Sequence, residues 1–563
     1  MLIWLVGMIR RGAGCVIAVM AALAIARSAA AVEGKNGMVA AEHELAAQAG
    51  LRILEEGGNA IDAACAAALA VGVTNPSSCG VGGGGFMLIY FAKTGQVYAL
   101  NYRERAPLAV REDMFMREGK PDDELLRAGP LAVAVPGEIA GVAAALKRFG
   151  TMKFSAVAQP AIELARDGFP CGAHLAREIA QTADGLRQDN GLKAVFLNPD
   201  GSPRKAGETI VSKDLAATLQ RLGDDPKAGF YQGSIADQIA AYMKSRGGLI
   251  TTGDLKDYQV EWEQPLALAY RGYEVYTMPP PSSGGGMLLE MLAMLAPGDA
   301  AGLGINSAPY LARLIEVMRQ GFIDRQGYGD PDFVKVPVGK LLSPEHINRA
   351  RDEALHRLNG SPQPTPGVTA AHDHGTSHLC VVDKQGNAVA LTTTINTPFG
   401  AKMMVAGLGI ILNNEMDDFA IAPGVANVYR LVGSEANAIA PGKRPLSSMT
   451  PTIVMKHDKP VLVLGGSGGP TITTGVLQVT LDVLDFHLEP DQAVAQARIH
   501  DQAVPDVAAV EDAMPPSRVA ALKAMGFKTR SVPMLGAVTA IAISASGIKG
   551  AGDPRKGGAA AGY

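Results

Sequence analysis

The spacing of apolar and polar residues predicts two helices and then two strands in the first part of the chain. Residues 39–56 have helical spacing, and Gly57-Gly58 ends them before an alanine-rich helical stretch at residues 60–73. Residues 86–91 are a continuous apolar run that follows four glycines, and residues 97–102 come after a short polar turn. We expect these last two segments to be buried strands, with backbones approaching closely at the glycines.

The C-terminal part of the chain has the alternating pattern of antiparallel strands. Residues 377–383 and 388–396 flank a Lys-Gln-Gly-Asn turn and predict a β-hairpin. We expect Asp383 to pair with Ala388, which places Thr376 beside the end of the second strand. Alternate residues of a strand share a face, so a row of polar side chains would stand next to Thr376. These residues are Thr392, Thr394 and Asn396.

A second hairpin is predicted at residues 451–464, and it leads into a glycine-rich turn. A helical pattern follows at residues 471–486, with Pro470 suited to the first helical position. The backbone amides of Gly468 and Gly469 would then lie at a helix amino terminus. That position can hold an oxyanion.

The middle of the chain mixes helical patterns with proline-rich connections. A Pro-Ser-Gly turn at residues 279–286 precedes a helix that we expect to begin at Met287. Residues 359–375, which are rich in Pro and polar residues, form the most linker-like interior segment.

Composition and charge narrow the function classes. The 563 residues carry a formal net charge of −4 and no long Lys/Arg run, so nucleic acid is the least favoured ligand. Residues 1–31 have the order of a secretory signal: Arg10-Arg11, an apolar stretch at 15–26 and a run of small residues. The alternative is an uncleaved membrane anchor, but the apolar stretch is shorter than the roughly 20 residues of a spanning helix. We therefore expect a periplasmic or secreted protein with no stable membrane insertion.

Neither cysteines nor histidines suggest a metal or disulfide framework. Four cysteines remain beyond the leader, without C-x-x-C spacing, and are expected to be buried small hydrophobes. They are Cys65, Cys79, Cys171 and Cys380. Three histidines near Thr376 raise a zinc hypothesis, but two fall in the linker-like segment and no carboxylate sits at ligand spacing. They are His372, His374 and His378.

Thr376 follows Gly375 at the end of the linker-like segment. We interpret the Gly375–Thr376 peptide bond as one that the protein cuts in itself, so that Thr376 becomes a chain terminus. A threonine hydroxyl is a weak nucleophile inside a chain, but at a terminus its own amine is close enough to act as the base. A flexible segment before Thr376 suits this chemistry, because the new end must move away.

Long motifs in a consistent order then identify a family resemblance. They are GGNAIDAA (57–64), GGGGFML (82–88), NYRERAP (101–107), DPDFVKVPV (330–338), TSHLCVVDKQGNAVALTTTINTPFG (376–400), NNEMDDF (413–419), KRPLSSMTPTIV (443–454) and the terminal AGY (561–563). With these motifs the chain resembles the gamma-glutamyltransferases, which are N-terminal nucleophile hydrolases made as one precursor and cut into two subunits.

The resemblance implies roles for individual residues. Thr376 would be the nucleophile for self-cleavage and catalysis, assisted by Thr394, and Gly468 with Gly469 would form the oxyanion hole. The substrate α-carboxylate would be held by Arg103, Ser447 and Ser448. Its α-ammonium would be held by Asn396, Glu415 and Asp418. Tyr429 would belong to a lid over the pocket. Within NYRERAP, Arg105 is an alternative to Arg103 for the carboxylate.

The resemblance also implies the architecture and the partners. We expect an α+β fold, a four-layer αββα sandwich, with a large subunit at residues 32–375 and a small one at 376–563. Substrates would be glutathione and other γ-glutamyl compounds, with water or an amino acid or dipeptide as acceptor. No cofactor and no metal are implied.

Two alternatives remain open. A cephalosporin or glutaryl acylase of the same family is one, although the retained amino-acid-binding residues argue against it. The other is an exported amino-acid or peptide-binding protein that never processes and stays a single chain.

Overall fold

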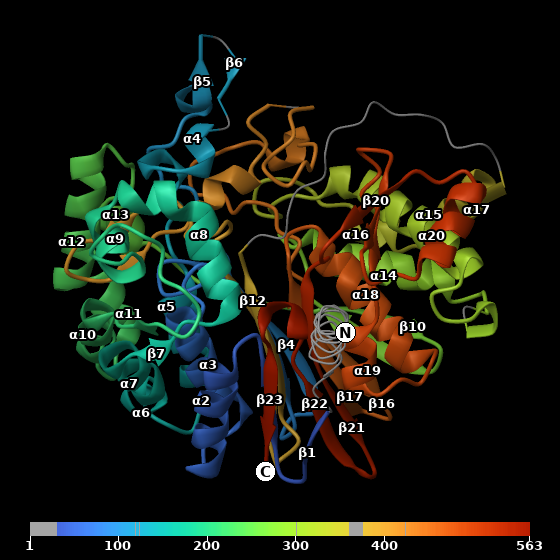
Figure 1. Ribbon diagram of the computed structural model, residues 1–563, viewed down its shortest axis with the longest axis horizontal. Helices are drawn as coiled ribbons and strands as arrows, with labels where there is room; N and C mark the ends of the chain where they lie inside the picture. Colours follow the sequence, from blue (N-terminus) through green and yellow to red (C-terminus); the bar gives the residue numbers. More distant parts are fainter. Residues whose placement is uncertain (1–30, 119, 123, 300, 360–374, 423) are drawn as a thin grey trace, which may run out of the picture.

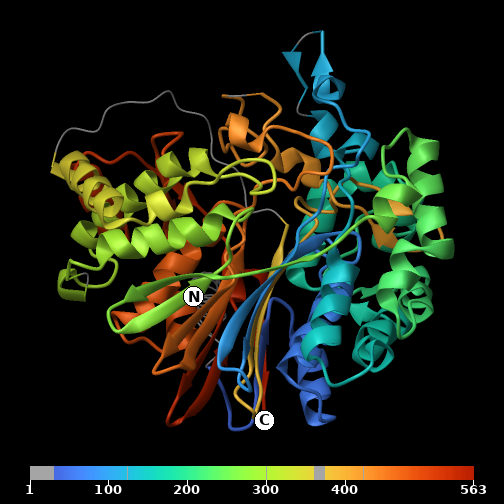
Figure 2. The ribbon, with the colours of Figure 1, turned by 180° about the vertical axis from the view of Figure 1, so that it is seen from behind.

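Two β-sheets lie face to face at the centre of the molecule, and helices cover the outer face of each (Figures 1 and 2). The computed structural model describes residues 31–118, 120–122, 124–299, 301–359, 375–422 and 424–563. The arrangement is the α+β, four-layer αββα sandwich that the resemblance implied. Each sheet buries one face against the other sheet and the second face under helices, so both faces are removed from water.

Each central sheet has seven strands and is antiparallel throughout. In spatial order the first sheet consists of β1 (Val32–Gly34), β22 (Gly547–Ala551), β21 (Ala537–Ser544), β17 (Lys459–Ser467), β16 (Thr452–Lys456), β11 (Tyr273–Thr277) and β10 (Leu266–Tyr270). The second consists of β23 (Ala559–Gly562), β2 (Met38–Ala41), β12 (Ser377–Val382), β13 (Ala388–Thr394), β3 (Gly84–Phe91), β4 (Gln96–Tyr102) and β9 (Glu261–Glu263). Both sheets combine strands from before and after Thr376.

The helices divide between the two outer layers in chain order. Those on the second sheet are α2 (Glu44–Glu55), α3 (Ala60–Thr74), α5 (Glu138–Phe149), α6 (Phe154–Val157), α7 (Gln159–Asp167), α8 (Ala173–Arg187), α9 (Asn190–Phe196), α10 (Lys213–Arg221), α11 (Pro226–Tyr231), α12 (Gly233–Arg246) and α13 (Thr252–Lys256). Those on the first sheet are α14 (Ser283–Leu295), α15 (Ala308–Asp324), α16 (Val338–Leu341), α17 (Pro344–Asn359), α18 (Thr471–Leu484), α19 (Pro490–Ala495) and α20 (Pro516–Ala524).

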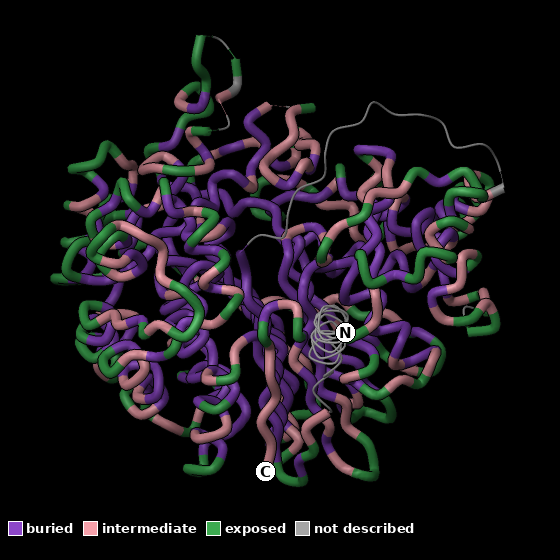
Figure 3. Tube along the Cα trace, in the orientation of Figure 1, coloured by how far each residue is buried: buried purple, intermediate pink, exposed green. Residues whose placement is uncertain are grey.

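Alternate residues of the central strands enter two separate hydrophobic cores. In β12, Leu379 and Val381 pack under the helices of the second sheet, whereas Cys380 and Val382 pack between the sheets. Figure 3 shows these strands buried along most of their length, with exposed residues confined mainly to the outer helices and loops. A strand that is buried on both faces often has a continuous apolar run, and this pattern predicted the apolar part of β3.

The first predicted helix is wrong at its start. Residues 38–41 form β2, and α2 begins only at Glu44. Every residue of β2 is buried, because the strand lies between β23 and β12. Its apolar run fits a helix as well as a buried strand, and the partners that decide the matter come from distant parts of the chain.

The predicted hairpin at Thr376 is confirmed, but the expected pairing of Asp383 with Ala388 is wrong by one residue. Val382 pairs with Ala388, and Asp383 closes the turn by accepting the amides of Gln385 and Asn387 through Oδ1, at 2.9 and 3.0 Å. Ser377 therefore pairs with Thr393. One step further along the same register, Thr376 lies beside Thr394.

One further helix start is corrected, and a second is confirmed at Thr471. The helix expected from Met287 begins at Ser283, since the Ser282 hydroxyl caps it and the glycines after it belong to the first turn. A Cβ on Gly285 would lie 2.0 Å from the Met278 carbonyl oxygen, so glycine here allows close packing. Pro470 precedes α18 as its N-cap rather than opening its first turn.

The four cysteines expected to be small hydrophobes are free and buried, which confirms that interpretation. Across the described ranges, no helix is both long and apolar enough to cross a bilayer. Most of the predicted leader at 1–31 lies outside the described residues, as do His372 and His374 of the zinc hypothesis.

His378 of β12 faces Gly465 of β17 between the two sheets. The His378 ring is buried, its Nδ1 lies 2.8 Å from Thr392 Oγ1, and burial lowers its pKa to about 3, so it is neutral. A Cβ added at Gly465 would lie 2.2 Å from the ring. The ring therefore occupies the space that a side chain at residue 465 would need.

We predict that Gly465→Ala lowers the thermal unfolding midpoint, because overpacking between sheets costs about 1–3 kcal/mol. Gly339→Ala is the control: Gly339 is exposed in α16, and an added Cβ meets no atom within 4 Å. Thermal unfolding followed by circular dichroism compares the two. Equal midpoints for both variants would show that the sheets can move apart locally at residue 465 without loss of stability.

Candidate active site

The Thr376 side chain is buried and lies against a second hydroxyl. Thr376 Oγ1 is 2.9 Å from Thr394 Oγ1, as the hairpin register requires. The backbone amide of Asn396 donates to Thr394 Oγ1 at 2.8 Å, which fixes this oxygen in place. Thr394 is thus positioned to exchange a hydrogen bond with Thr376.

The backbone at Thr376 is strained. Its φ is +88°, a region that β-branched residues rarely occupy, at a cost of about 1–3 kcal/mol. This torsion contains the carbonyl carbon of Gly375, so cutting the Gly375–Thr376 bond would abolish it. A Cβ at Gly375 would lie 2.2 Å from the Asn396 carbonyl oxygen. Only glycine therefore fits immediately before Thr376 in this conformation.

A buried lysine, Lys556, contacts the Thr376 backbone, and the sequence analysis did not find it. Lys556 Nζ donates to Ser467 Oγ at 2.8 Å and to the Thr376 carbonyl oxygen at 3.4 Å. It also lies 3.8 Å from Glu42 Oε2. Lys556, Glu42 and Ser467 are far apart in the sequence, so no local motif predicts their contact.

Arg103 is the centre of the polar end of the pocket. Its guanidinium is 1% exposed and pairs with Glu415 and Asp418. Its remaining hydrogen-bonding capacity goes to Glu104 at 3.5 Å and to the carbonyl oxygens of Pro445 at 3.2 Å and Leu446 at 3.4 Å. A ligand carboxylate must therefore displace one of these partners to reach Arg103.

The carboxyl groups around Arg103 outnumber it. Burial raises the pKa of Glu415 well above its ordinary value and that of Glu104 to about 7, although Arg103 opposes both shifts. Burial also raises the pKa of Asp418, again against Arg103. The three acids share Arg103, and Arg325 also favours the charged form of Asp418. A ligand ammonium would favour the charged forms of these acids further.

The backbone at Ser447 and Ser448 is held in place by hydrogen bonds to neighbouring segments. The Ser447 amide donates to Pro281 O at 2.9 Å, and the Ser447 carbonyl accepts the Ser283 amide and hydroxyl, both at 2.8 Å. The Ser448 carbonyl accepts the hydroxyl of Thr450 at 2.8 Å. The first residue of α14 thus positions Ser447, while Thr450 holds the backbone of Ser448.

Tyr429 reaches across the pocket from a loop. Its hydroxyl lies 2.6 Å from Asn396 Oδ1 and 3.0 Å from the Asn396 carbonyl oxygen, to which it donates. The Tyr429 ring rests on Gly469, where an added Cβ would lie 2.6 Å from it. The loop is therefore closed over the pocket in this structure.

The glycine-rich turn ahead of α18 has the geometry of an anion site. Gly468 and Gly469 have φ of +124° and +60°, and the Gly468 carbonyl accepts the Thr471 amide at 3.3 Å. In a trans peptide the N–H points opposite to the C=O, so the Gly469 amide faces away from the helix. An amide at a helix amino terminus favours negative charge.

The structure brings nearly all of the predicted site residues to one pocket. Its lining includes Arg103, Thr376, Thr394, Asn396, Glu415, Asp418, Tyr429, Ser447, Ser448 and Gly469. Gly468 is adjacent in the turn but does not line it. Arg105, the alternative to Arg103, lies elsewhere and donates to the Gly442 carbonyl at 2.9 Å. Arg325, which follows α15, also lines the pocket and was missed because no motif surrounds it.

Comparison with known proteins agrees with this geometry. A family model described as gamma-glutamyltranspeptidase matches residues 46–563. A glutathione hydrolase proenzyme of Escherichia coli (strain K12) is 42% identical over 530 residues, which covers 93% of this chain and 91% of the relative. The chain belongs to the gamma-glutamyltranspeptidase family.

Solved structures of similar proteins share the fold. A cephalosporin acylase from Bacillus halodurans has a TM-score of 0.84 at 30% identity and covers 95% of this chain and 97% of its own. The gamma-glutamyltranspeptidase of Helicobacter pylori has a TM-score of 0.54 at 39% identity, covering 55% of this chain and 90% of its own. These neighbours confirm the N-terminal nucleophile hydrolase type. The acylase is the more distant of the two in sequence.

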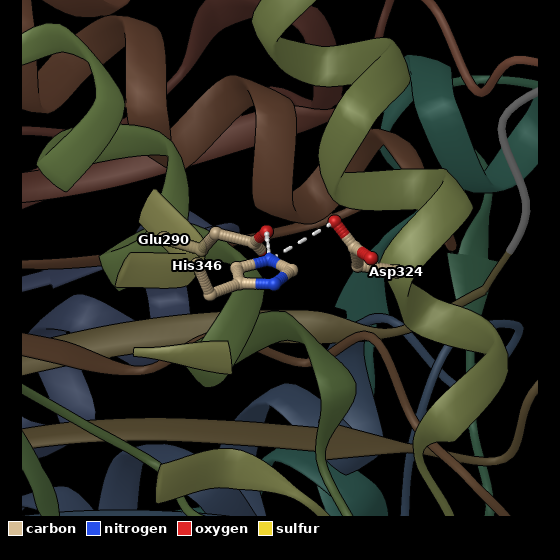
Figure 4. Close-up of side chains that lie close together, drawn as sticks. All are labelled: Glu290, Asp324 and His346. Carbon is tan, nitrogen blue, oxygen red and sulfur yellow. Dashed lines mark hydrogen bonds and ion pairs between the residues drawn. The ribbon is translucent and has the colours of Figure 1, made fainter. Parts of the chain in front are cut away.

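A separate buried cluster in the family member raises the question of a metal. Glu290 of α14, Asp324 of α15 and His346 of α17 converge on one point, as Figure 4 shows. His346 Nε2 lies 3.0 Å from Glu290 Oε1 and 3.3 Å from Asp324 Oδ2. Two carboxylates and an imidazole are a plausible ligand set for a transition metal.

The hydrogen bonds at this cluster indicate that it holds protons on Glu290 and His346, which does not suit a metal cation. Arg349 approaches His346 Nδ1 at 2.8 Å, and a guanidinium has only donors, so Nδ1 accepts and Nε2 carries the ring proton. Nε2 then has no lone pair for a metal. Burial, with the neighbouring Asp324 carboxylate, raises the pKa of Glu290 to about 10, so Glu290 is protonated at neutral pH.

We predict that Glu290→Gln unfolds at the same or a higher temperature than the wild type, and that its advantage grows from pH 7 to pH 9. The folded state holds the Glu290 proton to higher pH than the unfolded state, so wild-type stability falls as pH rises, whereas Gln is neutral throughout. Glu345→Gln, at an exposed position in the first turn of α17, is the control. A rise in midpoint on adding Zn²⁺ after EDTA, lost in Glu290→Gln, would instead reveal a cation site.

Proposed function

We propose that this family member is a self-processing γ-glutamyl transferase and glutathione hydrolase whose nucleophile is Thr376. The observation that carries the proposal is the shared pocket of the Thr376–Thr394 hydroxyl pair and the Arg103–Glu415–Asp418 cluster. A strained nucleophile and a binding site for an amino-acid head lie within one cavity.

Maturation would begin with attack of Thr376 Oγ1 on the Gly375 carbonyl carbon. The peptide C–N bond breaks as an ester forms, the Thr376 amine takes a proton, and water then hydrolyses the ester. Release of the +88° torsion favours the cut thermodynamically. The products would be a large subunit of residues 32–375 and a small one of residues 376–563.

Substrate binding would exploit the charges around Arg103. The α-carboxylate of a γ-glutamyl group would join Arg103 with Ser447 and Ser448, while its α-ammonium would meet Glu415, Asp418 and Asn396. The incoming zwitterion brings one charge of each sign, so it can exchange with the internal ion pairs without leaving a buried charge alone. An acylase substrate that lacks the ammonium would leave the acids uncompensated.

Turnover would then use the freed amine of Thr376 as the base. Thr376 Oγ1 attacks the γ-carbonyl, the oxyanion is held by the amides of Gly468 and Gly469, and the amine leaving group departs with a proton. Water or the amine of an amino acid or dipeptide resolves the acyl-enzyme. Hydrolysis and transfer therefore share one intermediate.

The leader-like residues 1–31 support export of the protein to a periplasm or the outside. Glutathione and other γ-glutamyl compounds would be met there. The alternative of an unprocessed binding protein has no use for a strained threonine beside a second hydroxyl.

Purified wild type is predicted to give two bands on a denaturing gel, with intact masses that correspond to a cut before Thr376. Thr376→Ala should give one band without γ-glutamyl turnover. Ser377→Ala is a matched control, because the Ser377 hydroxyl accepts from Asn75 Nδ2 at 3.1 Å and does not line the pocket. An uncut yet active Thr376→Ala protein would contradict the proposal.

Asp418→Ala is predicted to lower kcat/KM for a γ-glutamyl anilide roughly ten- to a hundred-fold, the range of one charged hydrogen bond. Self-cleavage should proceed, since no free ammonium is bound during maturation. Asp184→Ala, at a fully exposed aspartate, is the control. If self-cleavage and turnover fall together, Asp418 chiefly supports the fold.

A further inference from the structure

The loop that carries Tyr429 is held over the pocket by a side chain from another part of the chain. Gln502 Nε2 lies 3.2 Å from the Tyr429 carbonyl oxygen and 3.2 Å from that of Arg430. It also lies 3.3 Å from the Val504 carbonyl oxygen. Gln502 follows β18 (Ile499–His500), more than seventy residues from the loop.

The tight turn at residues 427–431 needs an external partner for its carbonyl groups. Inside the turn, Asn427 Oδ1 accepts the amides of Tyr429 at 3.0 Å and Leu431 at 3.1 Å. Arg430 has φ of +62°, which is unfavourable for a residue with a side chain. The amides are thus satisfied within the turn, while the Tyr429 and Arg430 carbonyls point out to Gln502.

The orientation of the Gln502 amide follows from its neighbours. Only the NH₂ end can face carbonyl oxygens, so Oε1 faces His500, whose Nε2 lies 3.0 Å away. His500 Nε2 must then carry the ring proton, and Nδ1 accepts from the Thr474 hydroxyl at 3.0 Å. Burial lowers the pKa of His500, which keeps the ring in this neutral form.

This chain of hydrogen bonds joins the loop to the helix behind the oxyanion turn. Thr474 is in the first turn of α18, which begins just after Gly469 and Pro470. Gln478, one turn further on, donates to the Ile499 carbonyl at 2.9 Å and accepts the Ile499 amide at 3.0 Å. The segment that carries His500 and Gln502 is therefore fixed rigidly to α18.

We propose that Gln502 is a positioning residue that latches the Tyr429 loop to α18 and so holds Tyr429 closed over the acyl group. This rests on the proposed γ-glutamyl activity. Tyr429 touches both Asn396 and Gly469, so the latch aligns the two sides of the pocket at once. Without it, the turn loses its carbonyl partners and the closed loop becomes less populated.

The test compares Gln502→Ala and Gln502→Glu with Gln496→Ala, a nearby glutamine whose contacts do not include the loop. For both Gln502 variants we expect KM for a γ-glutamyl anilide to rise about five- to thirty-fold, the effect of one or two hydrogen bonds. Glu should be at least as harmful as Ala, because its carboxylate would face carbonyl oxygens. Self-cleavage and the thermal midpoint should match those of the Gln496→Ala control.

A double-mutant cycle with Tyr429→Phe separates a latch from general support of the fold. If Gln502 acts through Tyr429, the double variant loses less than the product of the two single losses. Independent effects, unchanged kinetics in Gln502→Ala, or an equal loss of self-cleavage would overturn the proposal. Wild-type turnover is measured alongside, so absence of γ-glutamyl activity itself would be recognised as failure of the proposed function instead.

Discussion

The register between β12 and β13 is the constraint on which the site depends. Because Ser377 pairs with Thr393, the next residue back brings the Thr376 hydroxyl within 2.9 Å of the Thr394 hydroxyl. A slip of one residue would turn every side chain of β12 to the opposite face and send Thr376 into a hydrophobic core. The register is protected by the two cores themselves, since Cys380 and Val382 fit only between the sheets and Leu379 and Val381 only under the helices.

Around this hairpin the structure separates two physical tasks. Strain and hydroxyl contacts gather at Thr376, the proposed nucleophile, whereas charged groups gather at Arg103, in the proposed binding site for the substrate's amino-acid head. Three carboxyl groups surround the Arg103 guanidinium, and Arg325 also acts on Asp418, so both signs of charge are available to a zwitterionic ligand. Membership in the gamma-glutamyltranspeptidase family is consistent with both halves of the pocket.

The sequence predicted the parts of the fold and site that local patterns encode. Buried strands such as β3, the hairpin at Thr376 and the glycine turn before α18 all have short-range signals. The start of α2 was misplaced because β2 is apolar throughout and is paired only by distant segments. Long motifs located Arg103 and Asp418, but they could not show that these side chains pair with each other. Lys556, Arg325 and Gln502 escaped notice for the same reason, since each acts through tertiary contact and stands in no distinctive local pattern.

The interleaving of strands has a consequence for the cut protein. In the second sheet, β2 from before Thr376 lies between β23 and β12 from after it, and in the first sheet β16 borders β11. Two subunits that share both sheets cannot dissociate without breaking the backbone hydrogen bonds between neighbouring strands in both sheets. After cleavage the two subunits therefore remain associated. Exchange of subunits between molecules would require both sheets to come apart.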